Sequence, residues 1–385
     1  MAVSTASGVV DTSGPTSNQL KIDMRDAIAM LDPEESQFST ILMKLPEDRA
    51  KSFKTEWLDD QLLPRLSALS ACVGSVSTVL LVTASEAYYF RPGDLVRNSI
   101  SREAMLVTAV SIDTISATRG IGTVAAVSSV SGAELVIVGH AASQGGRSPL
   151  RVITKTATNY NYTQIQRHTF GFTETAEATE FYGGSLVARE RRKKGVEHKR
   201  ALEHTAFFGP RYYTATGPRH TCGGLLEYVT TNIRDASGTF DKGELQDNLR
   251  TDLQKGNKNR KALFASPIVG QVLGEFLQDN WVRSDPKLRY FGVKVDFVIS
   301  AAFGAELPVF VKREFGDFST DSTQFGGYAF LTDLENVQWA PFRNTQLKMN
   351  TQDNDEDSIN GEWKTEHSLK VEREETHSIW RGVTG

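Results

Sequence analysis

The sequence predicts an α+β fold with a small β-barrel-like domain inserted into it. Helices with recognisable caps alternate with short strands along most of the 385 residues, which indicates a mixed fold. Residues 71–150 differ from both flanks, since they hold no lysine and only five arginines. Evenly spaced short strands and turn signals within that stretch are typical of a small antiparallel barrel or sandwich.

The composition indicates an ordinary folded protein of two or three domains at ~150 residues each. Hydrophobic residues make up 39% and charged residues 23%, which excludes a disordered chain. A net charge of -4 argues against a dedicated nucleic-acid binder. We expect no membrane span and no secretory signal, and we expect the two distant cysteines, Cys72 and Cys222, to be reduced thiols.

The N-terminal region predicts an arm followed by two helices. Residues 1–20 are small and polar, and a short helix is expected at Ile22–Leu31. A second helix is predicted from a capping box formed by Asp32 and Glu35, with Pro33 at the first helical position. Its apolar stripe begins at Phe38, and Pro46 ends it.

Strands dominate the next hundred residues. Alternation of apolar and polar residues predicts four strands within the inserted domain, at Val76–Val82, Ala104–Val110, Asp113–Thr118 and Glu134–Val138. Residues 155–182 show similar alternation and are rich in Thr, Tyr and Phe, so strands are expected there too.

A long helix is predicted from about Ser185 to Phe208. Its body is polar nearly all round, and such helices depend on ion pairs four residues apart or on packing between other elements. The expected pairs are Glu190–Lys194, Lys193–Glu197 and Lys199–Glu203, with a bend at Gly195. Its basic residues are candidates for an inner-face or partner-facing role, with a solvated helix face as the alternative; they are Arg189, Arg191, Arg192, Lys193 and Lys194.

The C-terminal half predicts a mixture of helices and strands. Asp241 with Glu244, and Ser266 before Pro267, mark two further helix starts. Strands are expected at Val293–Ile299, Leu307–Lys312 and Tyr328–Thr332, and then at Thr345–Met349 and Trp363–Val371. An acidic turn ending in Asn360-Gly361 is expected to join the last two strands as a hairpin.

No set of residues predicts catalysis, cofactor binding or a metal site. The segment Gly238–Gly243 resembles a phosphate-binding loop, but Glu244 stands where that loop needs lysine. The acidic segment beginning at Asp353 resembles a calcium loop, but Ser358 and Lys364 replace its required glycine and glutamate. These absences favour a structural role over an enzyme.

The whole chain resembles the major capsid proteins of tailed bacteriophages that adopt the Hong Kong 97-type fold. No single motif carries the resemblance, which rests on the order and spacing of many. The resembling segments are Leu31–Pro33, Thr55–Asp60, Phe90–Asp94, Met105–Val110, Thr118–Gly120, Gly183–Phe208, Thr221–Leu226, Gly292–Asp296 and Val337–Gly385.

The resemblance implies a division of the chain into five parts. Residues 1–31 would form an N-terminal arm that reaches onto a neighbour, and residues 71–149 the inserted β domain. The peripheral domain would comprise residues 32–50, 170–215 and 335–385, including residues 185–208 as its spine helix. The extended loop would use residues 51–70 and 150–169, and the axial domain residues 216–334.

The resemblance also implies a function and partners. The protein would assemble into hexamers and pentamers of an icosahedral head that encloses double-stranded DNA, which it would contact weakly and non-specifically. A separate scaffolding protein, a portal and a cement or decoration protein are the other implied partners. The expected location is the virion, with the host cytoplasm during assembly. The alternatives are an encapsulin-like nanocompartment shell and a virion-associated hydrolase.

The extended loop is expected to contact a neighbouring subunit. Trp57, Leu58, Leu62 and Leu63 lie close together in the sequence and offer more apolar surface than an isolated hairpin can hide. We therefore expect a neighbour to bury these side chains, Trp57 in particular. Whether a lysine near this loop, Lys51 or Lys54, forms a covalent cross-link with Asn350 is left open.

Overall fold

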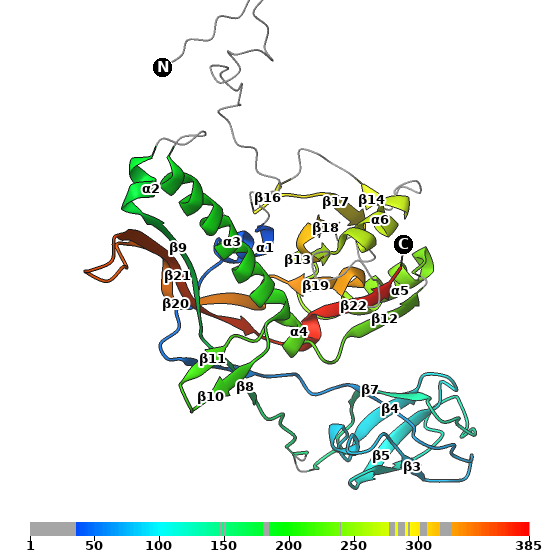
Figure 1. Cartoon of the computed structure of the whole chain (residues 1–385). Helices are drawn as coiled ribbons and strands as arrows, with labels where there is room; N and C mark the ends of the chain where they lie inside the picture. Colours follow the sequence, from blue (N-terminus) through cyan, green and yellow to red (C-terminus); the bar gives the residue numbers. More distant parts are fainter. Residues whose placement is uncertain are drawn as a thin grey trace, which may run out of the picture. The chain divides into compact units, whose positions relative to one another are not determined.

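The computed structural model describes residues 36–146, 148, 149, 151–179, 185–238, 240–276, 282, 283, 289–291, 293–300, 306–315 and 325–384. The expected arm and the helix expected at residues 22–31 lie outside these residues. The chain divides into two compact units (Figure 1). Unit 1 comprises Met1–Trp57 and Asn159–Gly385, and unit 2 comprises Leu58–Thr158. None of the helices in the described part of the chain is long and apolar enough to cross a membrane.

In the described part of unit 1, seven strands form a mixed sheet. Two of its pairings are parallel, β12 with β22 and β13 with β18, and the others are antiparallel. Across the sheet the order is β12 (Ile233–Gly238), β22 (Ser378–Val383), β19 (Ala329–Asp333), β13 (Lys261–Ala265), β18 (Glu306–Val311), β17 (Phe297–Ser300) and β14 (Val282–Arg283).

Both faces of this sheet are covered. In the central strand β13, Ala262 and Phe264 face one hydrophobic cluster, while Leu263 and Ala265 face another. This alternation follows from the two-residue period of a strand, and it explains why every residue of β13 is buried. One cluster contains residues of α1, α3 and α4, and the other contains residues of α5 and α6.

Three helices begin where the sequence predicted, and each start has a side-chain cap. The Ser185 side chain accepts a hydrogen bond from the Ala188 N–H, and α3 runs over Leu186–Phe208. Asp241 does the same at α5 (Lys242–Asp252), and Ser266 at α6 (Pro267–Glu275). By contrast, α1 (Gln37–Leu42) begins later than its capping box predicted, and its N-cap residue, Ser36, makes no side-chain cap.

A second sheet lies beside α3 in unit 1 (Figure 1). It consists of β20 (Val337–Met349), β21 (Ser358–Val371) and β9 (Gln164–Thr173), all antiparallel. The smaller elements of unit 1 are α2 (Glu174–Ala178), α4 (Leu225–Tyr228), β10 (Tyr212–Thr214), β11 (Arg219–Thr221), β15 (Arg289–Tyr290), β16 (Val293–Lys294) and the 3-10 turns Arg313–Phe315, Phe325–Gly327 and Glu374–Thr376.

The hairpin between β20 and β21 turns earlier than predicted. Asn360 and Gly361 lie inside β21, where they pair with residues 171 and 170 of β9, and the connection occupies residues 350–357. Gly361 is needed for packing rather than for a turn, since an added Cβ would lie 2.6 Å from the ring of Phe170. Asn350 adopts the left-handed conformation at the start of the connection, with φ 57°.

Unit 2 contains a closed antiparallel sheet. Six strands pair in the order β2 (Leu66–Ala68), β7 (Glu134–His140), β4 (Asp94–Asn98), β5 (Ala104–Val110), β6 (Thr114–Thr118) and β3 (Val79–Leu81). A bridge between Leu69 and Val82 joins the two edge strands, so no open edge remains along this side. The sheet includes residues 66–68, which lie before the boundary that the composition indicated at residue 71. A 3-10 turn, Ala87–Tyr89, precedes β4.

Unit 2 has a hydrophobic core of its own and a buried ion pair. The core includes Leu80, Val96, Ile115 and Leu135, each at most 1% exposed. Arg119 donates two hydrogen bonds, of 2.9 and 2.6 Å, to the carboxylate of Glu103. The pKa of Glu103 is lowered because these bonds and backbone donors outweigh the opposing effect of its burial. This core is what an autonomous domain requires.

We expect residues 58–158, expressed alone, to unfold in one cooperative thermal transition. A fragment of residues 71–149 is the matched control, because it lacks β2 and Leu69 and therefore cannot close the sheet. It should melt at a lower temperature. Circular dichroism during heating measures both, and a featureless melt of the longer fragment would contradict an independent domain.

Candidate functional site

Helix α3 is divided into a buried half and a basic half. Toward its C-terminal end Leu202, Ala206 and Phe207 are buried. Phe207 lies within an aromatic cluster, with ring centroids 4.5 Å from Phe38 and 4.9 Å from Phe315. Although most of α3 is polar, this end has an apolar face. That face packs into the hydrophobic cluster that also contains residues of α1, α4 and the main sheet.

One glutamate in the buried half of α3 has a structural role that the sequence did not indicate. Glu203 is 0% exposed, and its carboxylate accepts hydrogen bonds from the backbone N–H groups of Phe38 and Ser39, at 2.8 and 2.7 Å. Lys312, also fully buried, donates to the same carboxylate. Glu203 thus caps helix α1 from another element, which replaces the missing cap at Ser36.

The predicted basic residues of α3 separate into three environments. Arg189 lies 3.7 Å from Glu190, and Lys194 pairs with Glu197 at 2.6 Å rather than with the predicted Glu190. Lys193 is exposed. Arg191 and Arg192, both exposed, line a pocket.

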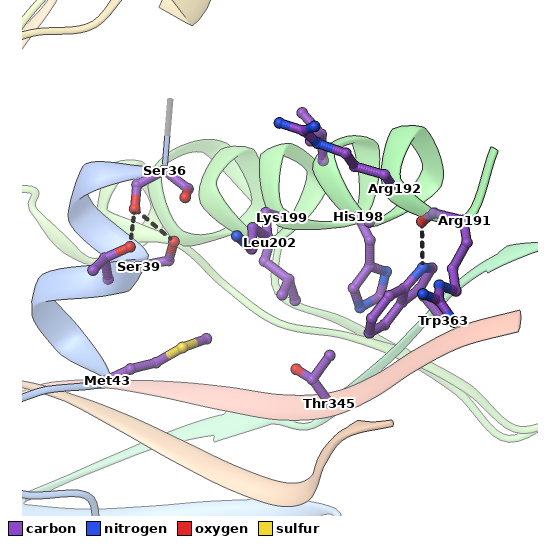
Figure 2. A pocket seen from close by; sticks show the side chains of 13 residues that line it. Ser36, Ser39, Met43, Arg191, Arg192, His198, Lys199, Leu202, Thr345 and Trp363 are labelled. Carbon is purple, nitrogen blue, oxygen red and sulfur yellow. Dashed lines mark hydrogen bonds between the residues drawn. The ribbon is translucent and has the colours of Figure 1, made fainter. Parts of the chain in front are cut away.

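This pocket lies between α1, α3 and the second sheet and has a volume of about 440 Å³ (Figure 2). Its apolar lining comes from Met43, Val196, Leu202 and Trp363. The Trp363 indole donates a hydrogen bond of 3.0 Å to the Arg191 carbonyl. Gly195, where a bend in the helix was predicted, faces the Trp363 ring; a Cβ there would lie 3.4 Å from the ring, an ordinary van der Waals contact, so this packing does not require glycine.

Buried histidines lie at this pocket, and one of them, His198, is part of its lining. His198 is hydrogen-bonded through Nδ1 to His168 and through Nε2 to Thr365, at 3.0 and 2.7 Å. Burial, together with the neighbouring His168, lowers the pKa of His198 to about 4. Next to this group His367 stacks on Trp339 at 4.3 Å, and burial lowers the pKa of His367 to about 3. These imidazoles are neutral packing groups at pH 7.

The prediction that a neighbour buries Trp57 is wrong. Trp57 lies in β1 (Lys54–Asp59), which pairs with β8 (Ala157–Tyr162), and it is 7% exposed within the chain itself. Its ring packs against Tyr228 with centroids 5.7 Å apart. Sequence spacing gave no sign of this, because Tyr228 is distant in the chain.

The loop leucines differ from Trp57. Leu58 and Leu62 are 68% and 93% exposed, and Leu63 is half-buried. They stay candidate contacts with a neighbouring subunit, since exposed aliphatic side chains this close together favour a partner surface.

Trp57→Ala should lower the free energy of unfolding by about 3 kcal/mol, because it removes a large buried side chain. Urea denaturation of the purified chain measures this change. A variant as stable as the wild type would show that the Tyr228 contact contributes nothing.

Aromatic side chains around β8 and β10 form a surface that local sequence signals did not indicate. Phe53 and Tyr213 are 46% and 42% exposed, and Tyr162 stacks on Tyr213 at 5.5 Å. Arg211 lies over the Tyr160 ring at 4.5 Å. The Tyr-rich sequence around residues 160–162 and 212–213 was the available signal, but only the fold brings these segments together.

The phosphate-loop-like and calcium-loop-like segments have structural roles. Asp241 serves as the cap of α5, and the acidic segment from Asp353 occupies the β20–β21 connection. His204 lies 3.4 Å from Glu314, whereas His198 bonds to other partners. No group of three or more potential metal ligands is found among the described residues.

Comparison with known proteins identifies a family model and several similar solved structures. A family model described as SU10 major capsid protein matches residues 7–384. No curated protein matches the sequence. A solved structure from Gordonia phage Cozz has a TM-score of 0.51 at 11% identity and covers 100% of this chain and 98% of that chain. One from Microbacterium phage Oxtober96 has a TM-score of 0.50 at 11% identity and covers 97% and 99%.

The holo-SrpI encapsulin complex from Synechococcus elongatus PCC 7942 is also similar, with a TM-score of 0.44 at 11% identity. It covers 60% of this chain and 78% of that chain. At this level the likeness supports no conclusion, and at 11% identity the two phage structures speak only for the fold.

Proposed function

Because this chain belongs to the SU10 major capsid protein family, we propose that its copies form hexamers and pentamers of an icosahedral tailed-phage head around double-stranded DNA. The match over residues 7–384 is the observation that carries this proposal. The protein is a major capsid protein and a component of the virion, and it assembles with copies of itself into a shell. The predicted Hong Kong 97-type fold is confirmed.

The division of labour within the chain follows from the same assignment. We infer that α1, α3 and most of the second sheet form the peripheral domain, and that α5, α6 and most of the seven-stranded sheet form the axial domain. Two strands cross the expected boundaries: β22, within residues 335–385, pairs in the seven-stranded sheet, and residues 164–169 of β9, expected in the extended loop, pair in the second sheet. The pair β1 and β8 supports an assignment as the base of the extended loop. The closed sheet and separate core of unit 2 support its assignment as the inserted β domain.

The family assignment favours a protein without catalytic activity, because its members are structural. A scaffolding protein, a portal and a cement or decoration protein are the further partners that we propose, with assembly in the host cytoplasm. Contact with DNA should be weak and salt-sensitive, because the net charge is -4 and glutamates interrupt the basic run of α3.

Electron microscopy of the expressed chain tests the proposal. Uniform shells, or isolated hexamers and pentamers, are expected, alone or with the proteins encoded beside it. Shells that package a protein cargo and exclude DNA would instead favour a nanocompartment. A monomer that hydrolyses polysaccharide would overturn the proposal in favour of a virion-associated hydrolase.

Leu62→Asp should impair shell assembly while leaving the subunit as stable as the wild type. The side chain is 93% exposed, so the substitution removes no buried contact and should change the stability by less than about 0.5 kcal/mol. Ile112→Asp is the matched control, since Ile112 is 78% exposed in unit 2 outside the extended loop. Light scattering measures assembly, and normal assembly of Leu62→Asp would remove this side chain from the contacts.

A further inference from the structure

The pocket between α1, α3 and the second sheet combines an apolar interior with a basic rim. Met43, Leu202 and Trp363 contribute apolar surface, while Arg191 and Arg192 carry positive charge (Figure 2). The described residues that line it include no Asp or Glu. A volume of about 440 Å³ falls within the ~300–1,000 Å³ of pockets that enclose a ligand. The lining therefore fits an apolar peptide segment with acidic flanks.

A segment with this chemistry directly precedes a residue of the pocket lining. Ser36 lines the pocket and is the first residue at which the described chain begins. Residues 26–35, Asp-Ala-Ile-Ala-Met-Leu-Asp-Pro-Glu-Glu, directly precede it. They contain five consecutive apolar residues, four acids and no lysine or arginine, so their chemistry is complementary to that of the pocket.

We propose that residues 26–35 bind in this pocket of their own chain, with Met30 and Leu31 in its apolar interior. Asp32, Glu34 and Glu35 then lie close to Arg191 and Arg192. The connection is long enough, because the five residues from Leu31 to Ser36 span up to ~17 Å when extended. Pro33 favours an extended conformation for Asp32 and so suits a linker of this kind.

Binding within the chain is favoured over binding of the same segment from a second copy. A tether of only a few residues keeps the local concentration of the segment in the millimolar range. A second copy would have to compete with that concentration and would also pay for association. Residues 1–25 remain available to reach a neighbour, so the pocket would fix the point at which the arm leaves its own subunit.

A disulfide assay on the unassembled full-length chain tests this placement. The chain carries Cys72→Ser to remove the exposed thiol, together with Leu31→Cys and Thr345→Cys, the latter in the pocket lining. Under mild oxidation we expect a disulfide within one chain, identified by peptide mass mapping. In the matched control, the second cysteine is introduced by Lys193→Cys instead of Thr345→Cys. Lys193 is an exposed residue of α3 outside the pocket lining, so this control should cross-link far less.

Charge reversal tests the basic rim. Arg191→Glu with Arg192→Glu should slow formation of the Leu31–Thr345 cross-link by about fivefold, as expected for the loss of two exposed ion pairs. Lys193→Glu should leave the rate unchanged. Replacing Glu34→Arg and Glu35→Arg in the reversed background should restore it. Circular dichroism confirms that each variant is folded.

Three outcomes would overturn the proposal. They are equal cross-linking of the Lys193→Cys control, a disulfide found only between two chains, and a rate that charge reversal does not change. A disulfide only between chains would assign the pocket to the arm of a second copy. Shell formation is scored separately by electron microscopy, so failure here leaves the proposed capsid function intact.

Discussion

Glu203→Gln is expected to lower the free energy of unfolding by about 3–5 kcal/mol, because it leaves the buried Lys312 ammonium without its counter-charge. The neutral amide also places an NH2 group where Glu203 now accepts a bond from Phe38 or Ser39. The variant should therefore lose both the ion pair and the cap of α1. Urea denaturation followed by circular dichroism measures the loss.

The double variant Glu203→Gln, Lys312→Met is the control that separates these effects. Removing both charges abolishes the uncompensated ammonium, so part of the lost stability should return while the poorer cap remains. A double variant as unstable as Glu203→Gln alone would show that capping of α1, and not the buried charge, dominates. Wild-type stability of Glu203→Gln would contradict the importance of the whole arrangement.

Acidification from pH 7 to pH 4 should destabilise the subunit strongly through three buried histidines. The pKa of His198 is lowered to about 4, and those of His367 and His377 to about 3, chiefly by burial. In the unfolded chain each histidine regains a pKa near 6.5. The unfolded state therefore binds protons first, and stability falls as the pH drops through about 6.5 and continues to fall toward pH 3–4.

At pH 4 the expected loss is about 3 kcal/mol per histidine, since each pKa unit corresponds to about 1.4 kcal/mol. Summed over the three, this approaches the ~5–15 kcal/mol that an entire domain has available. Denaturant midpoints measured at half-unit pH steps would show the trend. A stability that stays flat between pH 6.5 and pH 4 would contradict it.

His367→Phe isolates one contribution. Both ring nitrogens of His367 are buried without a hydrogen-bond partner in the described structure, and the ring stacks on Trp339. Phenylalanine keeps an aromatic ring on Trp339 and removes the titrating group, so the variant should retain its stability at pH 7 and lose less of it at pH 4. A pH profile identical to that of the wild type would remove His367 from the explanation.

Local signals predicted the elements whose energetics are local. Ser185, Asp241 and Ser266 each accept the hydrogen bond that a helix start leaves unsatisfied, and the three helices begin there. The alternation in residues 104–110 and 134–138 likewise gave strands at the right positions. Helix caps and strand alternation both depend on neighbours within a few residues, and those neighbours are visible in the sequence.

Local signals failed where a distant residue supplies the missing partner. Asn360-Gly361 is typical of a hairpin turn, yet both residues lie inside β21. Glycine is required at position 361 because a Cβ there would clash with the ring of Phe170. The apolar segment around Trp57 was expected to be exposed in the isolated subunit, yet the Trp57 side chain is buried against Tyr228. The side chain that caps α1 is Glu203, more than 160 residues away, whereas the N-cap residue Ser36 makes no side-chain cap.

The sequence by itself determined the mixed fold, three helix starts, a compositionally distinct β segment and the resemblance to a capsid protein. Only the tertiary structure decided which side chains are exposed, which charges are buried and where a pocket lies. The physical reason is that hydrogen-bond geometry and side-chain periodicity act over a few residues. Burial depends instead on the packing of segments that are far apart in the sequence. Arg191 and Ser36, for example, line one pocket only because α1 packs on α3.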